Sequence, residues 1–318
     1  MQNQVLQLLR KIAHGSVFDR PTGSFQTLQQ VRENSFGTVE NLLHRNGTIT
    51  GLATGFVHFD RMSSGLKRGE LTVIAAPPGM GSTSFAMSMV LNAAIHRNAI
   101  IGIFSLEMSR LSLLQRMLGS EAGVHQSRLA TGFLSREDLD KLESAMEALN
   151  TARISIDDTP GLSLGELRSR SRRLKKDQHG LDLIVVDSLQ LMSSTEPSAC
   201  HGFYENPVPD LSAISRGLSA LAKELNVPVV AALRLPVMNK PRDGDWRPVL
   251  HDLRPFGSIE RDADLVIFIH REVYYCAHED IPQADSRKAE AIVAKHHNGP
   301  NSTFHLDFVS ALARFSDL

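Results

Sequence analysis

Residues 71–84 have the pattern of a strand that leads into a phosphate-binding loop and then a helix. An apolar run begins at Leu71, and the small-residue stretch PPGMGSTS follows it. In a P-loop of the form G-x-x-x-x-G-K-[ST], backbone N–H groups hold the β- and γ-phosphates, a lysine neutralises them, and a hydroxyl group binds Mg²⁺. This spacing predicts a nucleotide site made of Pro78, Gly79, Met80, Gly81, Ser82, Thr83 and Ser84.

The loop departs from this pattern at two positions. Ala76 stands where the first glycine would be, and Ser82 stands at the position of the lysine. Gly81 and Thr83 fit the pattern. The sequence therefore predicts a loop that keeps its shape but has lost its positive charge.

Two acidic residues could work beside this loop. Asp187 ends the apolar run LIVVD, which is typical of a Walker B strand that delivers a carboxylate to Mg²⁺. Taken alone, such a run also fits a strand that meets a turn. Glu107 follows another expected strand and could polarise an attacking water, although taken alone an acid favoured by the dipole at a helix N-terminus is the simpler explanation. We therefore expect Thr83 and Asp187 to hold the metal.

Composition limits the class of protein. The chain has 318 residues, 42% of them hydrophobic, which is enough to bury a full core. A formal net charge of -1 excludes a global basic field, so contact with nucleic acid would need local patches. Cys200 and Cys276 cannot form a disulfide framework, and no signal peptide or membrane-spanning apolar run is present. We expect a soluble cytoplasmic protein.

The chain divides into an arm (1–26), a helix with a polar tether (27–50) and an α/β domain (51–318). Within the last segment, apolar strand candidates alternate with helix candidates. This alternation predicts a mainly parallel sheet with helices on both faces and a ligand at the carboxyl ends of the strands. The expected strands are 100–105, 153–156, 181–187, 227–232, 265–269, 289–295 and 303–308, and the expected helices are 110–119, 136–149, 163–176 and 211–225.

Several blocks resemble, in order, the C-terminal motor of DnaB-type replicative helicases. They are TGFVHFD at 54–60, the phosphate loop, FSLEM at 104–108, LQLM at 189–192, ISRGLSALAKELNVP at 214–228, GSIERDAD at 257–264 and NGP at 298–300. The resemblance implies a RecA-like fold, ATP and Mg²⁺ as cofactors, and a hexameric ring around single-stranded DNA. It also implies that a helix at 27–44 docks on a neighbouring subunit or on another helicase. The family's N-terminal, primase-recruiting domain has no counterpart in the arm.

The resemblance also identifies the catalytic positions and their departures. Besides Ser82, the glutamine that senses the γ-phosphate is replaced by Arg234, and the Lys-x-Arg pair that reaches a neighbour's nucleotide survives as Lys295 and His297. Glu107 and Asp187 are retained. Loss of an arginine finger alone can cost about 10³ or more in turnover. We therefore expect ATP hydrolysis to be weakened or lost.

The DNA side of the motor is altered in a similar way. The loop 193–210 after the Walker B strand carries three acidic residues and no lysine or arginine, so it would repel phosphate. The later element DLRPFG at 252–257 keeps an arginine and a glycine. Basic residues around Trp246 suit a single strand, although a solvated loop with one tucked aromatic fits equally well. The expected nucleic-acid contacts are Arg242, Arg247, Arg254 and Gly257.

Three functions remain open at this point. The first is a DnaB-family motor with impaired hydrolysis that acts in DNA replication or in transactions of a mobile element. The second is an active ATP-dependent 5'-3' DNA helicase in which Arg234 or Lys295 supplies the missing cation. The third is a structural module that caps, loads or inhibits another helicase ring through its docking helix. The histidines show no metal-binding spacing, so no metal other than nucleotide-bound Mg²⁺ is expected.

Overall fold

A computed structural model of the chain describes residues 25, 27–35, 49–193, 210–237, 242, 244–275 and 287–318. The chain divides into two units, Met1–Thr48 and Ile49–Leu318. In the first unit the structure describes helix α2 (Leu28–Ser35), which falls within the segment expected to be a docking helix. The rest of that segment, nearly all of the arm, and the acidic loop between 193 and 210 lie outside the described residues.

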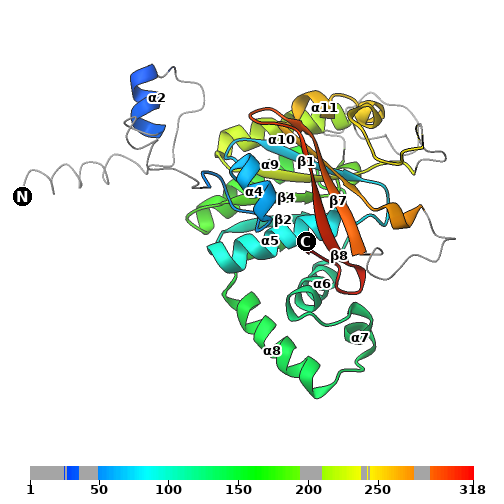
Figure 1. Cartoon of the computed structure of the whole chain (residues 1–318). Helices are drawn as coiled ribbons and strands as arrows, with labels where there is room; N and C mark the ends of the chain where they lie inside the picture. Colours follow the sequence, from blue (N-terminus) through cyan, green and yellow to red (C-terminus); the bar gives the residue numbers. More distant parts are fainter. Residues whose placement is uncertain are drawn as a thin grey trace, which may run out of the picture. The chain divides into compact units, whose positions relative to one another are not determined.

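The second unit is built on one nine-stranded sheet (Figure 1). Its strand order is β3-β2-β4-β5-β1-β6-β7-β8-β9. The strands from β3 to β6 run parallel, whereas β7, β8 and β9 pair antiparallel. The bounds are β1 Leu71–Ala76, β2 Ile101–Ser105, β3 Ile154–Asp157, β4 Leu183–Asp187, β5 Val229–Arg234, β6 Leu265–His270, β7 Lys288–His296, β8 Ser302–Val309 and β9 Arg314–Asp317.

Helices cover both faces of this sheet, with α5 on one face and α9 and α10 on the other (Figure 1). Side chains of β1 alternate between two apolar cores, so that Ile74 packs toward α5 and Val73 packs toward α10. The prediction of a mainly parallel, doubly covered sheet is confirmed. The helices are α4 Val57–Ser63, α5 Ser82–Arg97, α6 Arg110–Ala122, α7 Gln126–Thr131, α8 Arg136–Thr151, α9 Leu164–Asp177, α10 Leu211–Leu225 and α11 Ile259–Asp262.

Local capping explains where the longer helices begin. Ser135 and Asp138 form a capping box at α8, and Ser163 and Glu166 form another at α9. Ser163 is therefore the N-cap of α9 rather than its first residue, one position from the predicted start. Asp210 caps α10 by accepting hydrogen bonds from two backbone N–H groups. Such caps satisfy helical N–H groups that would otherwise have no partner.

An aromatic cluster joins the end of the chain to the start of α5. Phe85 stacks on Phe56 with ring centroids 4.8 Å apart and meets Phe315 of β9 edge-on at 5.5 Å. Phe315 also stacks on Phe308 of β8 at 4.3 Å. β9 has no strand signal in the sequence, because the four-residue segment RFSD carries only one buried apolar side chain. Part of the support for the phosphate loop is thus supplied by an unpredicted strand.

In the part of the chain that the structure describes, no helix is both long enough and apolar enough to cross a membrane.

Candidate nucleotide and DNA site

The predicted phosphate loop contains two glycines with positive φ angles. Gly79 and Gly81 have φ angles of 81° and 101°, values that favour glycine. A Cβ atom on Gly81 would lie 2.9 Å from the ring of Phe315, so this position admits no side chain without rearrangement. Met80 is fully buried and anchors the loop. The Phe85 N–H donates to the Gly81 carbonyl at 2.8 Å, and α5 thereby starts directly behind the loop.

The loop contains no charged side chain. Ser82 is the first residue of α5, is half-buried, and supplies only a hydroxyl group where a lysine would bring an ammonium. Backbone N–H groups and the helix dipole still favour an anion here. Pro78 and Thr83 are half-buried, whereas Ser84 is buried within α5. The structure thus places six of the seven predicted residues at the loop surface or in its support, with Ser84 turned into the helix packing.

Asp187 and Thr83 form the candidate metal site. Asp187 ends β4, is 3% exposed, and lies close enough to the Thr83 hydroxyl group for that group to lower the pKa of its carboxyl. Its Oδ1 atom is buried and has no hydrogen-bond partner among the described residues. Burial raises the pKa of the Asp187 carboxyl, and the nearby charge of Glu107 raises it further. A buried carboxylate oxygen beside a hydroxyl group matches the oxygen ligands that Mg²⁺ prefers, so these residues fit the ion.

The raised pKa of Asp187 leads to a testable effect on stability. Asp187→Asn is expected to increase the free energy of unfolding at pH 7 by about 1 kcal/mol, because a neutral amide avoids the cost of a buried charge. Since the folded pKa lies above the unfolded one, the ionised carboxylate destabilises the fold as the pH rises through the folded pKa. The difference should therefore vanish below about pH 4. Urea titrations at both pH values measure it, and a less stable variant at pH 7 would contradict burial as the cause.

Glu107 and Arg234 form an ion pair across the carboxyl ends of β2 and β5. The Arg234 backbone is held by Gln190, whose side chain accepts from its N–H at 3.2 Å and donates to its carbonyl at 2.7 Å. Both charged side chains are partly exposed, at 52% for Arg234 and 36% for Glu107. The charge of Arg234 also acts on Asp187. The site therefore holds a cation, but it is paired with the expected catalytic base.

The two residues expected to reach a neighbour's nucleotide behave differently. The Lys295 ammonium donates to the carbonyls of Glu260, Arg261 and Ala263, at distances of 2.8, 3.2 and 2.5 Å. These carbonyls belong to the end of α11, so the lysine stabilises its own subunit. His297 is exposed just beyond β7. Nothing in this arrangement gives His297 the permanent charge of an arginine.

Arg271 is a site residue that the sequence analysis missed. It follows β6, and its Nη1 atom donates to the Gly79 carbonyl at 3.3 Å. Its guanidinium lies 4.5 Å from the ring centroid of Phe308, and its buried Nε atom has no partner among the described residues. A sequence signal was available, since the arginine directly follows an apolar strand at the ligand-binding edge of the sheet. Arg271 brings a cation to the loop, although its contact is to a carbonyl oxygen.

The four residues predicted to bind nucleic acid separate into two kinds. Arg242 donates to Asp252 at 2.7 Å, and Arg247 forms a two-pronged ion pair with Glu290 at 2.6 and 2.8 Å. Arg254, in contrast, is exposed and has no ion pair among the described residues. Gly257 is exposed, with a φ angle of 81°. Arg254 therefore keeps its guanidinium available for phosphate, whereas the Gly257 N–H already donates to the Arg254 carbonyl at 3.1 Å.

The aromatic residue between these arginines is not free either. Trp246 stacks on Tyr275 with ring centroids 4.3 Å apart and an interplanar angle of 9°. Tyr275 in turn lies 6.0 Å from the buried His270 ring. This packing agrees with the interpretation of Trp246 as a tucked aromatic. Base stacking on Trp246 would require the pair to separate.

Sequence comparisons place the second unit in a known family. Residues 51–317 match the DnaB-like helicase C terminal domain. The chain is 40% identical over 297 residues to "Replicative DNA helicase DnaB" of Geobacillus stearothermophilus, covering 93% of this chain and 63% of that protein. It is also 40% identical over 297 residues to "Replicative DNA helicase DnaC" of Bacillus subtilis (strain 168), with the same coverage. The chain thus spans less than two thirds of the length of these relatives.

Solved structures agree with this assignment. One solved ATPase domain superimposes with a TM-score of 0.80 and 31% identity, covering 90% of this chain and 98% of that domain. A DnaB-like replicative helicase, solved in connection with its interactions with primase, gives a TM-score of 0.76 and 30% identity, covering 100% of this chain and 72% of that one. The predicted phosphate loop and the strand that ends at Asp187 both lie within the matched residues. The chain therefore belongs to the DnaB-like helicase family, and residues 51–317 form its C-terminal, RecA-like ATPase domain.

Proposed function

We propose that the chain is a DnaB-family motor that binds Mg·ATP weakly, hydrolyses it slowly or not at all, and acts on single-stranded DNA in replication or in transactions of a mobile element. The observation that carries this proposal is Ser82, an uncharged residue in a loop whose backbone is otherwise built for phosphate. A phosphate lysine supplies the main charge that neutralises the β- and γ-phosphates. The backbone conformation of the loop supports nucleotide binding, and the lack of a positive charge at Ser82 supports slow turnover.

The remaining residues have separate roles in this proposal. Backbone N–H groups of the loop bind the phosphates, and Thr83 and Asp187 hold Mg²⁺, which neutralises charge on the phosphates when it is bound. Glu107 orients the attacking water and accepts its proton. Glu107 is paired with Arg234, so this base becomes available only when the pair opens. His297 replaces a finger that would be charged at every pH.

A direct comparison of turnover tests the proposal. Steady-state ATP hydrolysis of the full chain, with and without oligo(dT), is measured beside the Geobacillus stearothermophilus protein. Loss of the phosphate lysine and of an arginine finger is expected to reduce turnover by about 10³ or more. Turnover of similar size in the two proteins would mean that the departures are compensated.

The second candidate function is an active helicase, and the position of Arg234 is the observation that favours it. Its guanidinium lies close enough to influence Asp187 and Glu107, where it could stabilise a transferring phosphoryl group. In that case Arg234→Ala would abolish ATP-driven unwinding. If Arg234 instead only restrains Glu107, its removal would release the base.

We expect Arg234→Gln to raise the residual ATP turnover by about tenfold, because freeing the base recovers part of the 10²–10⁴-fold that general base catalysis contributes. Stability should change by less than about 1 kcal/mol, since both partners are partly exposed. Arg68→Gln is a matched control, because Arg68 is also 52% exposed and pairs with Asp182. A fall in turnover with Arg234→Gln alone would favour the active helicase.

We also propose that residues 27–44 mediate self-association into a ring, or docking on another helicase that this chain caps, loads or inhibits. Leu28 and Val31 of α2 are 88% and 43% exposed, as expected for an apolar face that awaits a partner. Multi-angle light scattering of the full chain separates these outcomes. A ring-sized mass supports self-association, whereas a monomer at every concentration would contradict it.

A further inference from the structure

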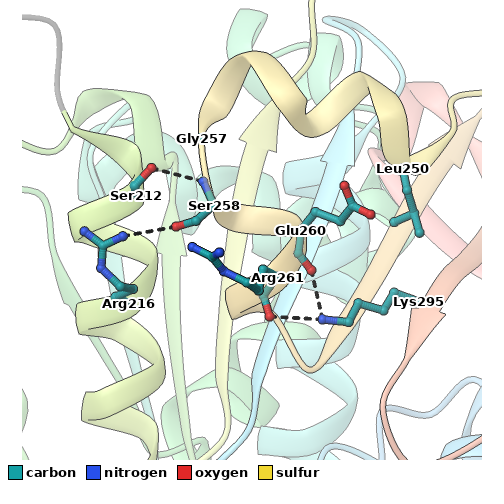
Figure 2. A pocket seen from close by; sticks show the side chains of 8 residues that line it. All are labelled: Ser212, Arg216, Leu250, Gly257, Ser258, Glu260, Arg261 and Lys295. Carbon is teal, nitrogen blue, oxygen red and sulfur yellow. Dashed lines mark hydrogen bonds between the residues drawn. The ribbon is translucent and has the colours of Figure 1, made fainter.

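A cleft of about 780 Å³ lies between α10, the turn at Gly257 and Ser258, and the end of β7 (Figure 2). Two guanidinium groups line it, from Arg216 of α10 and Arg261 of α11. Figure 2 shows the guanidinium of Arg261 turned toward Arg216 and away from the side chain of Lys295. The cleft includes Gly257, one of the residues predicted to contact DNA, and it is separate from the phosphate loop.

The two guanidinium groups in this cleft have few partners among the described residues, whereas the Lys295 ammonium, which also lines it, donates to three carbonyls. Arg216 makes one long hydrogen bond, to the Ser258 hydroxyl at 3.4 Å, and Arg261 has no side-chain partner among the described residues. Glu260 is the single carboxylate among the described residues that line the cleft, and it forms no ion pair with either arginine. Two neighbouring guanidinium groups repel each other, and an anion between them would relieve that repulsion.

The turn at Gly257 and Ser258 leads into α11, which carries Arg261, and it is fixed against α10, which carries Arg216. The Ser258 N–H donates to the Ser212 hydroxyl at 3.0 Å, and the hydroxyl groups of Ser258 and Ser215 both donate to Asp262, at 2.5 and 2.6 Å. A Cβ atom on Gly257 would lie 2.0 Å from the Ser212 hydroxyl oxygen, so the two elements are in direct contact. The backbone segments that carry Arg216 and Arg261 are therefore fixed relative to each other before any ligand binds.

We propose that Arg216 and Arg261 bind successive backbone phosphates of single-stranded nucleic acid in this cleft. Guanidinium groups recognise phosphate with paired hydrogen bonds, and a phosphodiester needs no base-specific contact. The geometry favours a nucleic-acid backbone as the source of the phosphate groups, because the exposed Arg254 and Gly257 lie on the same short segment as the turn. Arg242 and Arg247, already paired with carboxylates, contribute less. The inference rests on the proposed function, since it assigns the DNA contact of that motor.

Fluorescence anisotropy with labelled oligo(dT) tests the inference on the full chain. The double variant Arg216→Gln/Arg261→Gln is expected to bind at least about tenfold more weakly, because it loses charge-assisted hydrogen bonds. The negative slope of log affinity against log salt should become shallower by about 1.4, because each phosphate contact to a single strand contributes about −0.7 to that slope. Arg216→Lys/Arg261→Lys should keep the slope, because lysine retains the point charge.

A charge-matched control is Arg97→Gln/Arg173→Gln. Both arginines are exposed, and Arg97 lies in the last turn of α5, at the opposite end of that helix from the phosphate loop. This control should bind within about threefold of the unmodified chain at physiological salt, where distant charges are screened.

The other outcomes are distinct. If the cleft variant binds oligo(dT) with the affinity and salt slope of the unmodified chain, the inference is wrong while the proposed function stands. If that variant keeps DNA binding but loses ATP turnover, the cleft serves a nucleotide instead and the inference is again wrong. If the unmodified chain does not bind oligo(dT) at all, the DNA part of the proposed function fails, and the inference fails with it.

Discussion

Replacing Ser82 with lysine is expected to tighten Mg·ATP binding by roughly tenfold to a hundredfold, because a charge-assisted hydrogen bond contributes about 1.5–3 kcal/mol. The substitution places an ammonium at the start of α5, directly after Gly81, whose φ angle is 101°. A cation at a helix N-terminus costs only about 0.3–1 kcal/mol, so the phosphate contact should dominate. Titration with a fluorescent ATP analogue measures the change.

The matched control for this substitution is Ser144→Lys. Ser144 is an exposed residue of α8, where an added lysine changes the net charge equally but lies outside the site. Its ATP affinity should equal that of the unmodified chain. If Ser82→Lys also leaves the affinity unchanged, the loop is not limited by its missing charge, and a compensating cation such as Arg234 or Arg271 must already act there.

Replacing Phe85 with alanine should lower the free energy of unfolding by about 3–5 kcal/mol, the usual cost of removing a fully buried phenylalanine. Phe85 is 1% exposed and contacts the rings of Phe56 and Phe315. Ring pairs of this geometry add about 0.5–1.5 kcal/mol beyond burial, so the upper part of the range is expected. Because Phe85 lies one turn behind the loop, nucleotide binding should weaken as well.

Urea denaturation measures the effect of Phe85→Ala, with Phe133→Ala as its control. Phe133 is 83% exposed, so the same change in side chain should alter stability by less than about 0.5 kcal/mol. Equal, small effects of the two substitutions would show that the aromatic cluster does not hold α5 in place. A large effect of Phe85→Ala alone would indicate that contact with β9 helps to hold α5 and the phosphate loop in place.

The sequence was a good guide to the parallel half of the sheet, for a physical reason. Strands buried on both faces read as continuous apolar runs, and β1, β2 and β4 are buried along their whole length. The predicted starts of two strands, in contrast, lie two residues before the observed ones. Leu181 and Val227 are buried but precede β4 and β5, since burial continues into the approach to a strand where ladder pairing has not begun.

The antiparallel part of the sheet and the state of the charged residues were harder to foresee. β9 has a single buried apolar residue, Phe315, and its pairing with β8 depends on contacts distant in sequence. Sequence motifs identified Arg247 and Lys295 as candidate functional residues. They could not show that Glu290 neutralises Arg247, because Glu290 is 43 residues away in the sequence. Nor could they show that the Lys295 ammonium donates to carbonyl groups at the end of α11, which are 32–35 residues away.

A calorimetric titration of the unmodified chain with Mg·ATP and with Mg·ADP is the most direct test of the missing charge at Ser82. Without a lysine on the terminal phosphates, the γ-phosphate adds little binding energy, and the two affinities should agree within about threefold, a difference of less than about 1 kcal/mol. A preference for ATP of about a hundredfold or more would contradict this account, because it would require a strong cation on the γ-phosphate.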